Sequence, residues 1–207
     1  MKTSMRFVLG GSVAAAALLA AGIGMGMGGR DAADPATAAA PAEAKTFSID
    51  PVHSNVIFKI KHNNASNFYG RFDKVSGSFT VGDTASFDVK VDAASVDTNN
   101  SKRDDHVKSP DFLSVKEFPE ISFSGKDFKK SGDSWKGSGE LSLHGVKKTI
   151  EVEIKQIGMG AGMGGKGEVA GVEANITIKR TDYGVKGMVG PLGDDVTLWV
   201  SLEGGSK

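Results

Sequence analysis

The chain has 207 residues, and its 25 Lys and Arg are balanced by 25 Asp and Glu, so the formal net charge near pH 7 is zero. This length suits one domain with an N-terminal extension and provides enough residues to bury a core. The balanced charge gives no electrostatic reason for nucleic-acid binding, so we expect no nucleic-acid partner. The sequence has no cysteine, which excludes disulfides, thiolate metal sites and cysteine nucleophiles.

The N-terminal segment has the layout of a secretory signal. Two basic residues precede an uncharged and largely apolar run over residues 7–29. An Ala- and Pro-rich spacer follows over residues 31–44, and its small residues offer several cleavage sites. We assign residues 1–44 to a signal peptide and spacer, and residues 45–207 to the folded domain. We therefore expect a periplasmic or secreted protein, with an uncleaved membrane anchor as the alternative.

The folded domain opens with a predicted strand inside Asp50–His62. One face of this strand carries Val56, Phe58, Ile60 and His62, while lysines fall on the other face. This period-2 alternation is typical of a strand that lies between an apolar interior and water. The apolar face ends in a histidine, so the strand brings an ionisable group to the end of an apolar surface.

Seven further stretches alternate in the same way. They cover residues 68–81, 87–92, 121–128, 135–143, 150–155, 172–179 and 196–203. Each has one apolar and one polar face, which favours an antiparallel barrel or sandwich over a parallel sheet covered on both sides. Short connections with turn residues favour a meander. The sequence therefore predicts an all-β domain with an extended, eight-stranded, antiparallel up-and-down barrel.

The alternation lapses between Ser95 and Pro119. Within this segment Asn99–Lys108 begins with helix-capping residues and contains no β-branched run. We predict a short helix there that crosses one end of the barrel. Phe112 and Phe118 bring aromatic side chains to the same end.

A barrel of about eight strands either fills its interior with side chains or leaves room for one small ligand. The pattern of the residues alone leaves both interpretations open. The candidate lumen residues are the inward-facing apolar positions of the strands and of the crossing segment: Val56, Phe58, Ile60, Phe72, Phe79, Val89, Phe112, Phe123, Leu141, Ile176 and Leu198.

A series of short motifs follows one another along the domain. They are Asp50–Ser54, Gly70–Phe72, Ser95–Thr98, Arg103–Leu113, Phe118–Phe123, Gly139–Lys148 and Arg180–Gly184. In this order they resemble the YceI-like family, the polyisoprenoid-binding, lipocalin-like proteins of bacteria. The resemblance covers roughly Phe47–Glu203. It implies a barrel whose apolar lumen takes a long isoprenoid chain, in an exported protein without established catalytic activity.

This sequence departs from the family pattern at three places. Val107 stands where leucine is usual, Leu113 takes a common aromatic position, and Tyr183 replaces a phenylalanine. The first two reduce bulk near the mouth of the barrel, and the third adds a hydroxyl. These departures leave the length or the head group of the ligand open.

Five polar side chains are candidates for the mouth or for contact with a ligand head group: His62, Arg103, His106, Arg180 and Tyr183. For both arginines a structural tether is favoured over a partner for a ligand phosphate or phenol. His53 is interpreted as fixing the start of its strand by bonding either the backbone or Asp50. No HxH or HExxH pair occurs, so we expect no metal and no cofactor.

The sequence thus predicts a binding protein, not an enzyme, that holds an isoprenoid or similar amphipathic lipid for transport or storage, with a stress-related role as an option. A metal-dependent or acid/base enzyme that uses His62, His106 and a carboxylate is the alternative. A third interpretation is a structural or partner-binding protein with a filled core. A homodimer and a transient membrane contact are further partner expectations. Gly158–Gly167 is interpreted as a flexible hairpin tip or, alternatively, as an apolar flap at the entrance.

Overall fold

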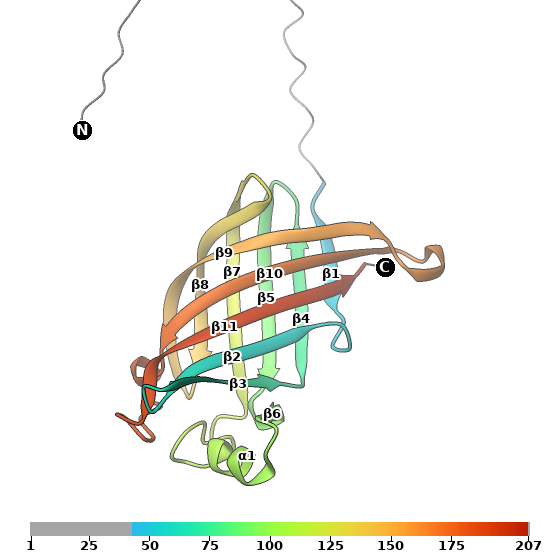
Figure 1. The fold of residues 1–207 in the computed structure, drawn as a ribbon. Helices are drawn as coiled ribbons and strands as arrows, with labels where there is room; N and C mark the ends of the chain where they lie inside the picture. Colours follow the sequence, from blue (N-terminus) through green and yellow to red (C-terminus); the bar gives the residue numbers. More distant parts are fainter. Residues whose placement is uncertain (1–42, 207) are drawn as a thin grey trace, which may run out of the picture. The chain divides into compact units, whose positions relative to one another are not determined.

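The computed structural model describes residues 43–206, which fold into an antiparallel barrel (Figure 1). The strands are β1 Lys45–Ile49, β2 Asn55–His62, β3 Ser66–Phe72, β4 Val75–Val81, β5 Thr84–Asp92, β6 Val96–Asp97, β7 Glu120–Ser131, β8 Ser134–Leu143, β9 Val146–Ala161, β10 Glu168–Lys179 and β11 Leu192–Gly205. The helices are α1 Ser101–Lys108 and the 3₁₀ turns η1 Ala93–Ser95, η2 Met163–Gly165 and η3 Arg180–Tyr183. The expected signal peptide and nearly all of the spacer lie outside the described residues. Among those described, no helix has the length and apolar character needed to span a bilayer.

The strands β1 to β11 form a closed wall of eight. Three of the wall strands are interrupted, so each of them consists of two of the strands given above. β1 and β2 both pair with β11, through Ser48–Gly205 and Val56–Val200 for example. On their other side, β1 pairs with β4 and β2 pairs with β3, while β5 and β6 continue the wall beyond β4 and β3. Neighbouring strands are antiparallel and follow chain order around the barrel. The predicted up-and-down barrel is therefore confirmed.

The break between β1 and β2 is built by a local hydrogen-bond cluster. The Asp50 carboxylate accepts hydrogen bonds from the Val52 backbone N–H at 2.8 Å and lies 2.8 Å from His53 Nδ1. This arrangement is an Asx-type turn, in which a side chain satisfies backbone groups that a strand would otherwise pair. The Ser54 hydroxyl accepts from the Glu203 backbone N–H at 3.1 Å and so ties the break to β11. This geometry matches the structural role that we inferred for His53.

Aromatic side chains fill the barrel end at which β1 lies. Phe47, Phe79, Phe128 and Trp135 are at most 1% exposed. Phe47 and Phe79 stack with ring centroids 5.5 Å apart, and Trp135 Nε1–H donates to the Gly82 carbonyl at 2.9 Å. This end is packed in the manner of an ordinary protein core.

The other end of the barrel is crossed by α1, which confirms the predicted short helix (Figure 1). The Asn100 side chain accepts from the Arg103 backbone N–H at 3.1 Å and caps the helix. α1 has no buried residue, so polar contacts contribute to holding it. Asp104 provides one of them, because its Oδ1 accepts from the backbone N–H and the hydroxyl of Thr98 at 2.7 and 2.5 Å.

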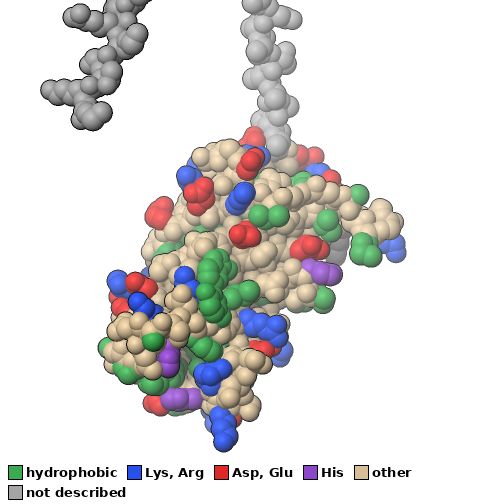
Figure 2. Space-filling model, viewed as in Figure 1, with side chains coloured by type: hydrophobic (Ala, Val, Ile, Leu, Met, Phe, Trp, Pro, Cys, Tyr) green, Lys and Arg blue, Asp and Glu red, His purple; other side chains and the backbone are tan. Residues whose placement is uncertain are grey.

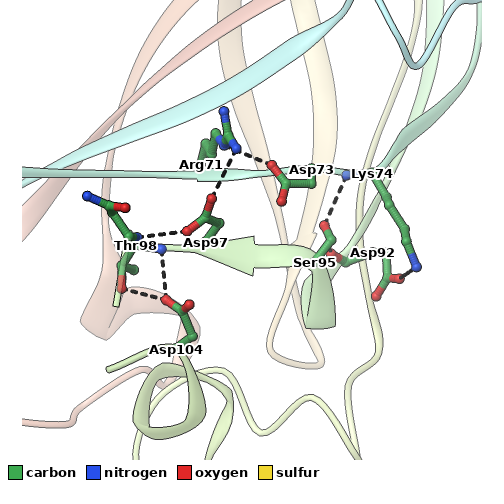
Figure 3. Close-up of polar contacts among 9 residues, drawn as sticks. Arg71, Asp73, Lys74, Asp92, Ser95, Asp97, Thr98 and Asp104 are labelled. Carbon is green, nitrogen blue, oxygen red and sulfur yellow. Dashed lines mark hydrogen bonds and ion pairs between the residues drawn. The ribbon is translucent and has the colours of Figure 1, made fainter. Parts of the chain in front are cut away.

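Further polar contacts attach this crossing segment to the barrel wall (Figure 3). Arg71 of β3 donates to Asp97 at 3.0 Å, and Asp97 also accepts from the Asn99 backbone N–H at 2.7 Å. These hydrogen bonds, the backbone one first, hold the pKa of Asp97 below its ordinary value. In the connection between β3 and β4, the Lys74 backbone N–H donates to Ser95 Oγ at 3.1 Å. The crossing segment is therefore attached both to β3 and to the β3–β4 connection.

Candidate functional site

An apolar cavity of about 360 Å³ occupies the α1 end of the barrel. This volume lies within the range of about 300–1,000 Å³ that is usual for ligand pockets. Of its 25 lining residues, all but six are apolar. A second cavity of about 90 Å³ lies deeper, and both cavities share the wall residues Val56, Val91, Ile121, Leu141 and Leu198. The hollow part of the barrel therefore extends from α1 toward the filled end.

The structure brings ten of the eleven candidate lumen residues to these cavities. The larger cavity is lined by Val56, Phe58, Ile60, Phe72, Phe112, Leu141 and Leu198, and the smaller one by Val89, Phe123 and Ile176 together with three of the same set. Phe79 is the exception. It faces inward as expected, but it packs against Phe47 in the filled end and lines neither cavity. The assignment of Phe79 to the lumen wall is corrected for that reason.

The aromatic part of the wall depends on one glycine. The ring of Phe58 packs over Gly70 of β3, where a Cβ would lie 2.3 Å from Phe58 Cζ. The same ring lies 5.8 Å, centroid to centroid, from that of Phe72. Only glycine allows so close an approach of the ring to the neighbouring strand. Gly70 thus holds Phe58 against the wall and keeps the lumen open.

The polar lining residues of the larger cavity all lie at its mouth near α1: His62, Ser66, Thr98, Arg103, His106 and Arg180. Arg103 donates from Nε to the Thr98 hydroxyl at 2.9 Å and from Nη2 to the Thr98 carbonyl at 2.5 Å. Its guanidinium also lies 4.5 Å from the ring centroid of Phe68. None of the ion pairs within residues 43–206 includes Arg103. Arg103 is thus tethered, and it still brings an uncompensated positive charge to the mouth.

Arg180 has a more purely structural role than Arg103. It is 4% exposed and donates to four backbone carbonyls, those of Val185, Gly187, Leu192 and Gly193, at 2.7 to 3.3 Å. Burial lowers the pKa of Arg180, and the negative charge of Asp194 opposes that shift. Because its donors are engaged by carbonyls, Arg180 mainly fixes the loop between η3 and β11.

The remaining mouth candidates differ from one another in position. Tyr183 is 1% exposed and lines neither cavity, so its expected place at the mouth is corrected: it packs against Leu141 and Ile178 inside the wall. Burial raises the pKa of its hydroxyl, which has no hydrogen-bond partner among the described residues. His62 and His106 line the mouth, and His106 Nε2 lies 3.3 Å from Asp111 Oδ2.

The lining also contains residues that were not among the candidates. Phe68 lies four positions before Phe72, and Val196 lies two positions before Leu198. Period-2 alternation from these candidates could therefore have identified both. Met188 also lines the mouth, but it belongs to an irregular loop in which no periodic signal exists.

The Gly- and Met-rich hairpin tip lies far from this mouth. β9 and β10 extend past the filled end, on the side of the barrel away from α1 (Figure 1). The opposite end of β9 follows the turn at His144, whose Nδ1 lies 3.2 Å from the Tyr183 carbonyl oxygen. The alternative interpretation of Gly158–Gly167 as a flap at the entrance is therefore wrong.

Within residues 43–206, the one group of side chains with metal-ligand spacing is Asp50, His53 and Glu203. It lies at the β1–β2 break, outside the lumen, and His53 Nδ1 is 3.8 Å from Glu203 Oε1. The hydrogen bond to Asp50 raises the pKa of His53, and the same bond lowers the pKa of Asp50. An exposed hydrogen-bonded turn accounts for this group.

Comparison with known proteins gives a consistent family match. A family model described as the YceI-like domain matches residues 47–204. A UPF0312 protein of Pseudomonas aeruginosa is 40% identical over 172 residues, which span 80% of this chain and 90% of the relative. Protein YceI of Escherichia coli is 37% identical over the same extent.

Solved structures of related barrels superpose on this one. The Campylobacter jejuni YceI protein has a TM-score of 0.62 at 32% identity, covering 72% of this chain and 91% of that one. Burkholderia cenocepacia BcnA has a TM-score of 0.66 at 21% identity, with 75% and 98% covered. A polyisoprenoid-binding domain from Saccharophagus degradans has a TM-score of 0.58 at 16% identity, with 80% and 100% covered. The last two likenesses concern the fold alone.

Proposed function

Because this chain belongs to the YceI-like family, we propose that it is an exported, non-catalytic carrier that holds an isoprenoid or similar amphipathic lipid in its lumen. The observation that carries this proposal is the distribution of polarity in the cavity. Most residues that line the larger cavity are apolar, and its six polar ones come from the chain segments at the α1 end: His62, Ser66, Thr98, Arg103, His106 and Arg180. A ligand with a long apolar chain and one polar end matches that distribution.

The lumen and the mouth contribute differently to binding. Each methylene that leaves water on entering the lumen contributes about 0.8 kcal/mol, so a long chain provides affinity without polar contacts. The mouth determines which end of the lipid stays outside. There Arg103, His62 and His106 offer hydrogen-bond donors to a head group, and a phosphate, carboxylate or phenol oxygen would accept them.

The direct test is organic extraction of the natively purified protein, followed by mass spectrometry of the extract. We expect a long-chain amphipathic lipid at close to one molecule per barrel. Phe58→Asp places a charge in the lumen and abolishes co-purification, since an unpaired charge is strongly disfavoured in an apolar cavity. Ile157→Asp is the matched control, because Ile157 is 57% exposed on the hairpin beyond the filled end. A folded Phe58→Asp protein with undiminished lipid would contradict the proposal.

One contact favours the alternative of an enzyme. His106 and Asp111 are paired at the mouth, and a carboxylate that orients a histidine is a common arrangement in acid/base catalysis. We propose that this pair is structural, because both side chains are substantially exposed, at 49% and 72%, and the neighbouring Phe112 ring packs edge-on against the imidazole at 5.0 Å. Recovery of a chemically altered lipid with the wild type but not with His106→Ala would favour catalysis instead.

A further inference from the structure

The loop Val185–Leu192 between η3 and β11 forms one lip of the mouth. Two of its side chains, Met188 and Val189, are 48% and 63% exposed. Met188 also lines the larger cavity. The same side chain therefore faces the solvent and the lumen, so the lip makes an apolar path from the outside of the protein into the cavity.

This lip is held in place by specific contacts. The buried Arg180 guanidinium donates to carbonyls on both of its halves, at Val185 and Gly187 and at Leu192. The Leu192 backbone N–H donates to the Met188 carbonyl at 3.0 Å, and the Asn63 N–H of the β2–β3 turn donates to the Pro191 carbonyl at 2.6 Å. A loop with so many bonds presents its two apolar side chains in a fixed arrangement.

The backbone of the lip is held in a conformation that local preference does not explain. The backbone of Met188 has a φ of 49°, in the left-handed region that residues other than Gly, Asn and Asp rarely adopt. Such backbone strain persists where the surrounding contacts impose it, and it is concentrated at functional sites. Here it turns an apolar side chain outward at the mouth.

The charged residues around the lip suit a negatively charged surface. The segments that frame the mouth, residues 61–66, 99–117 and 185–192, contain six basic residues: Lys61, Lys102, Arg103, Lys108, Lys116 and Lys186. They contain four acidic residues: Asp104, Asp105, Asp111 and Glu117. Two of the four are engaged, Asp104 by Thr98 and Asp111 by His106. Basic and histidine side chains are visible at this end of the molecule in Figure 2.

The outer wall of the barrel differs in part. Some of its lysines are paired with carboxylates, as in Lys45–Glu168 at 2.6 Å, Lys147–Glu140 at 2.9 Å and Lys179–Asp195 at 3.0 Å. Others have no ion pair among the described residues: Lys59, Lys126, Lys129, Lys130, Lys155 and Lys166. None of the six basic residues of the mouth takes part in an ion pair within residues 43–206. The segments that frame the mouth therefore carry six basic against four acidic residues, and the basic side chains among them are free of ion pairs with other described residues.

We propose that the lip docks on an anionic lipid bilayer, with Met188 and Val189 inserted among the acyl chains and the basic residues over the head groups. Apolar insertion combined with basic side chains is the usual basis of interfacial binding to anionic membranes. The docking rests on the proposed carrier function, because an apolar path into the lumen matters only for a lipid that moves through it. In this arrangement the lipid passes between bilayer and lumen along Met188.

The test is co-sedimentation of the full folded domain with vesicles of phosphatidylcholine, with and without phosphatidylglycerol. We expect binding that requires phosphatidylglycerol and weakens with salt. Met188→Ser/Val189→Ser lowers the partition coefficient at least about tenfold, given the apolar area withdrawn from the membrane. Met163→Ser/Val52→Ser is the matched control: these side chains are more exposed, at 95% and 81%, and they lie toward the filled end. The control keeps wild-type binding.

Several outcomes overturn the proposal. Equal losses in both double variants, or none in either, exclude the lip as the docking surface. A change of oligomeric state in Met188→Ser/Val189→Ser, measured by light scattering, without a change in vesicle binding would assign the lip to a protein interface. Lipid content is measured separately by extraction. A protein that binds vesicles through the lip yet never carries lipid contradicts the carrier function alone, and one that carries lipid but ignores vesicles contradicts the docking alone.

Discussion

The two ends of this barrel are built from the same alternating strands, yet one end is solid and the other is hollow. At the β1 end, Phe47 and Phe79 stack over Gly204, where a Cβ would lie 2.9 Å from both side chains. At the α1 end, Phe58 lies flat against the wall over Gly70. The side chains that face inward are aromatic in both places. At the β1 end the rings of Phe47 and Phe79 stack on each other, whereas at the α1 end the ring of Phe58 borders a cavity.

The largest expected effect is a difference between the two ends in how much stability is lost when an aromatic ring is removed. Phe47→Ala removes a ring that is 0% exposed from the filled end and lowers the free energy of unfolding by about 3–5 kcal/mol. Phe58→Ala removes a ring that already borders a cavity, so we expect a clearly smaller loss. Urea unfolding followed by tryptophan fluorescence measures both. Equal losses would mean that the two ends are packed alike and that the contrast is mistaken.

The second prediction concerns the glycine that keeps the lumen open. Gly70→Ala introduces a Cβ that meets the Phe58 ring at 2.3 Å, so the ring must rotate into the cavity. We expect a loss of about 1–3 kcal/mol in stability from overpacking and a reduced lipid content in extracts. Gly70→Ala/Phe58→Leu should recover the lipid content, because a smaller side chain fits beside alanine. A double variant that stays empty would show that Gly70 acts through the backbone instead.

Much of this architecture follows from local pattern. Alternation with period 2 identified eight wall strands and placed nine side chains around the cavities, because side-chain direction in a strand depends only on position along it. The tenth, Phe112, comes from the crossing segment. The breaks inside three of the wall strands were not predicted. They depend on a local turn such as that of Asp50 and His53 and on pairing with distant strands. The short helix was predicted from its capping residues.

What local pattern could not decide depends on partners that are distant in sequence. Phe79 and Phe58 look alike in their strands, and only Phe47 and Gly204, brought close by pairing, place Phe79 in a filled core. Tyr183 lies next to the motif of Arg180, but its direction is set by η3, which turns it into the wall. The lip residue Met188 has no periodic neighbours at all. The missed parts of the site therefore lie where the chain is irregular.

A third, smaller effect is expected in the segment that covers the hollow end. Asp104→Ala leaves the backbone N–H and hydroxyl of Thr98, which is 3% exposed, without their acceptor. An unsatisfied buried donor costs about 1–3 kcal/mol in stability, and local rearrangement of the segment reduces this cost. We expect faster amide hydrogen exchange in residues 98–113 while the filled end keeps its protection. Asp105→Ala, an exposed neighbour, is the control. Uniform acceleration across the barrel would show that α1 is not a separate cover.

The smallest effect lies at the β1–β2 break, where the sign of a pH dependence can be worked out. The hydrogen bond to the Asp50 carboxylate raises the pKa of His53 above about 6.5, so the charged pair contributes fully below that pH. Its contribution is lost as the pH rises through the raised value. Asp50 has a lowered pKa, so its contribution is present above about 3.8 and lost as the pH falls through the lowered value. The pair therefore supports the turn in the window between these limits.

Nuclear magnetic resonance titration of the His53 imidazole measures this coupling directly. Asp50→Asn keeps the shape of the turn and removes the charge, so the midpoint of His53 should fall toward its ordinary value. Thermal stability should change little, because both groups are exposed and solvent screens the pair. A midpoint that does not move would show that Asp50 holds the break through the Val52 N–H alone. In that case the titration of His53 would not affect the turn, and only the protonation of Asp50 at acid pH would weaken it, because the Val52 N–H also lowers the pKa of that carboxyl.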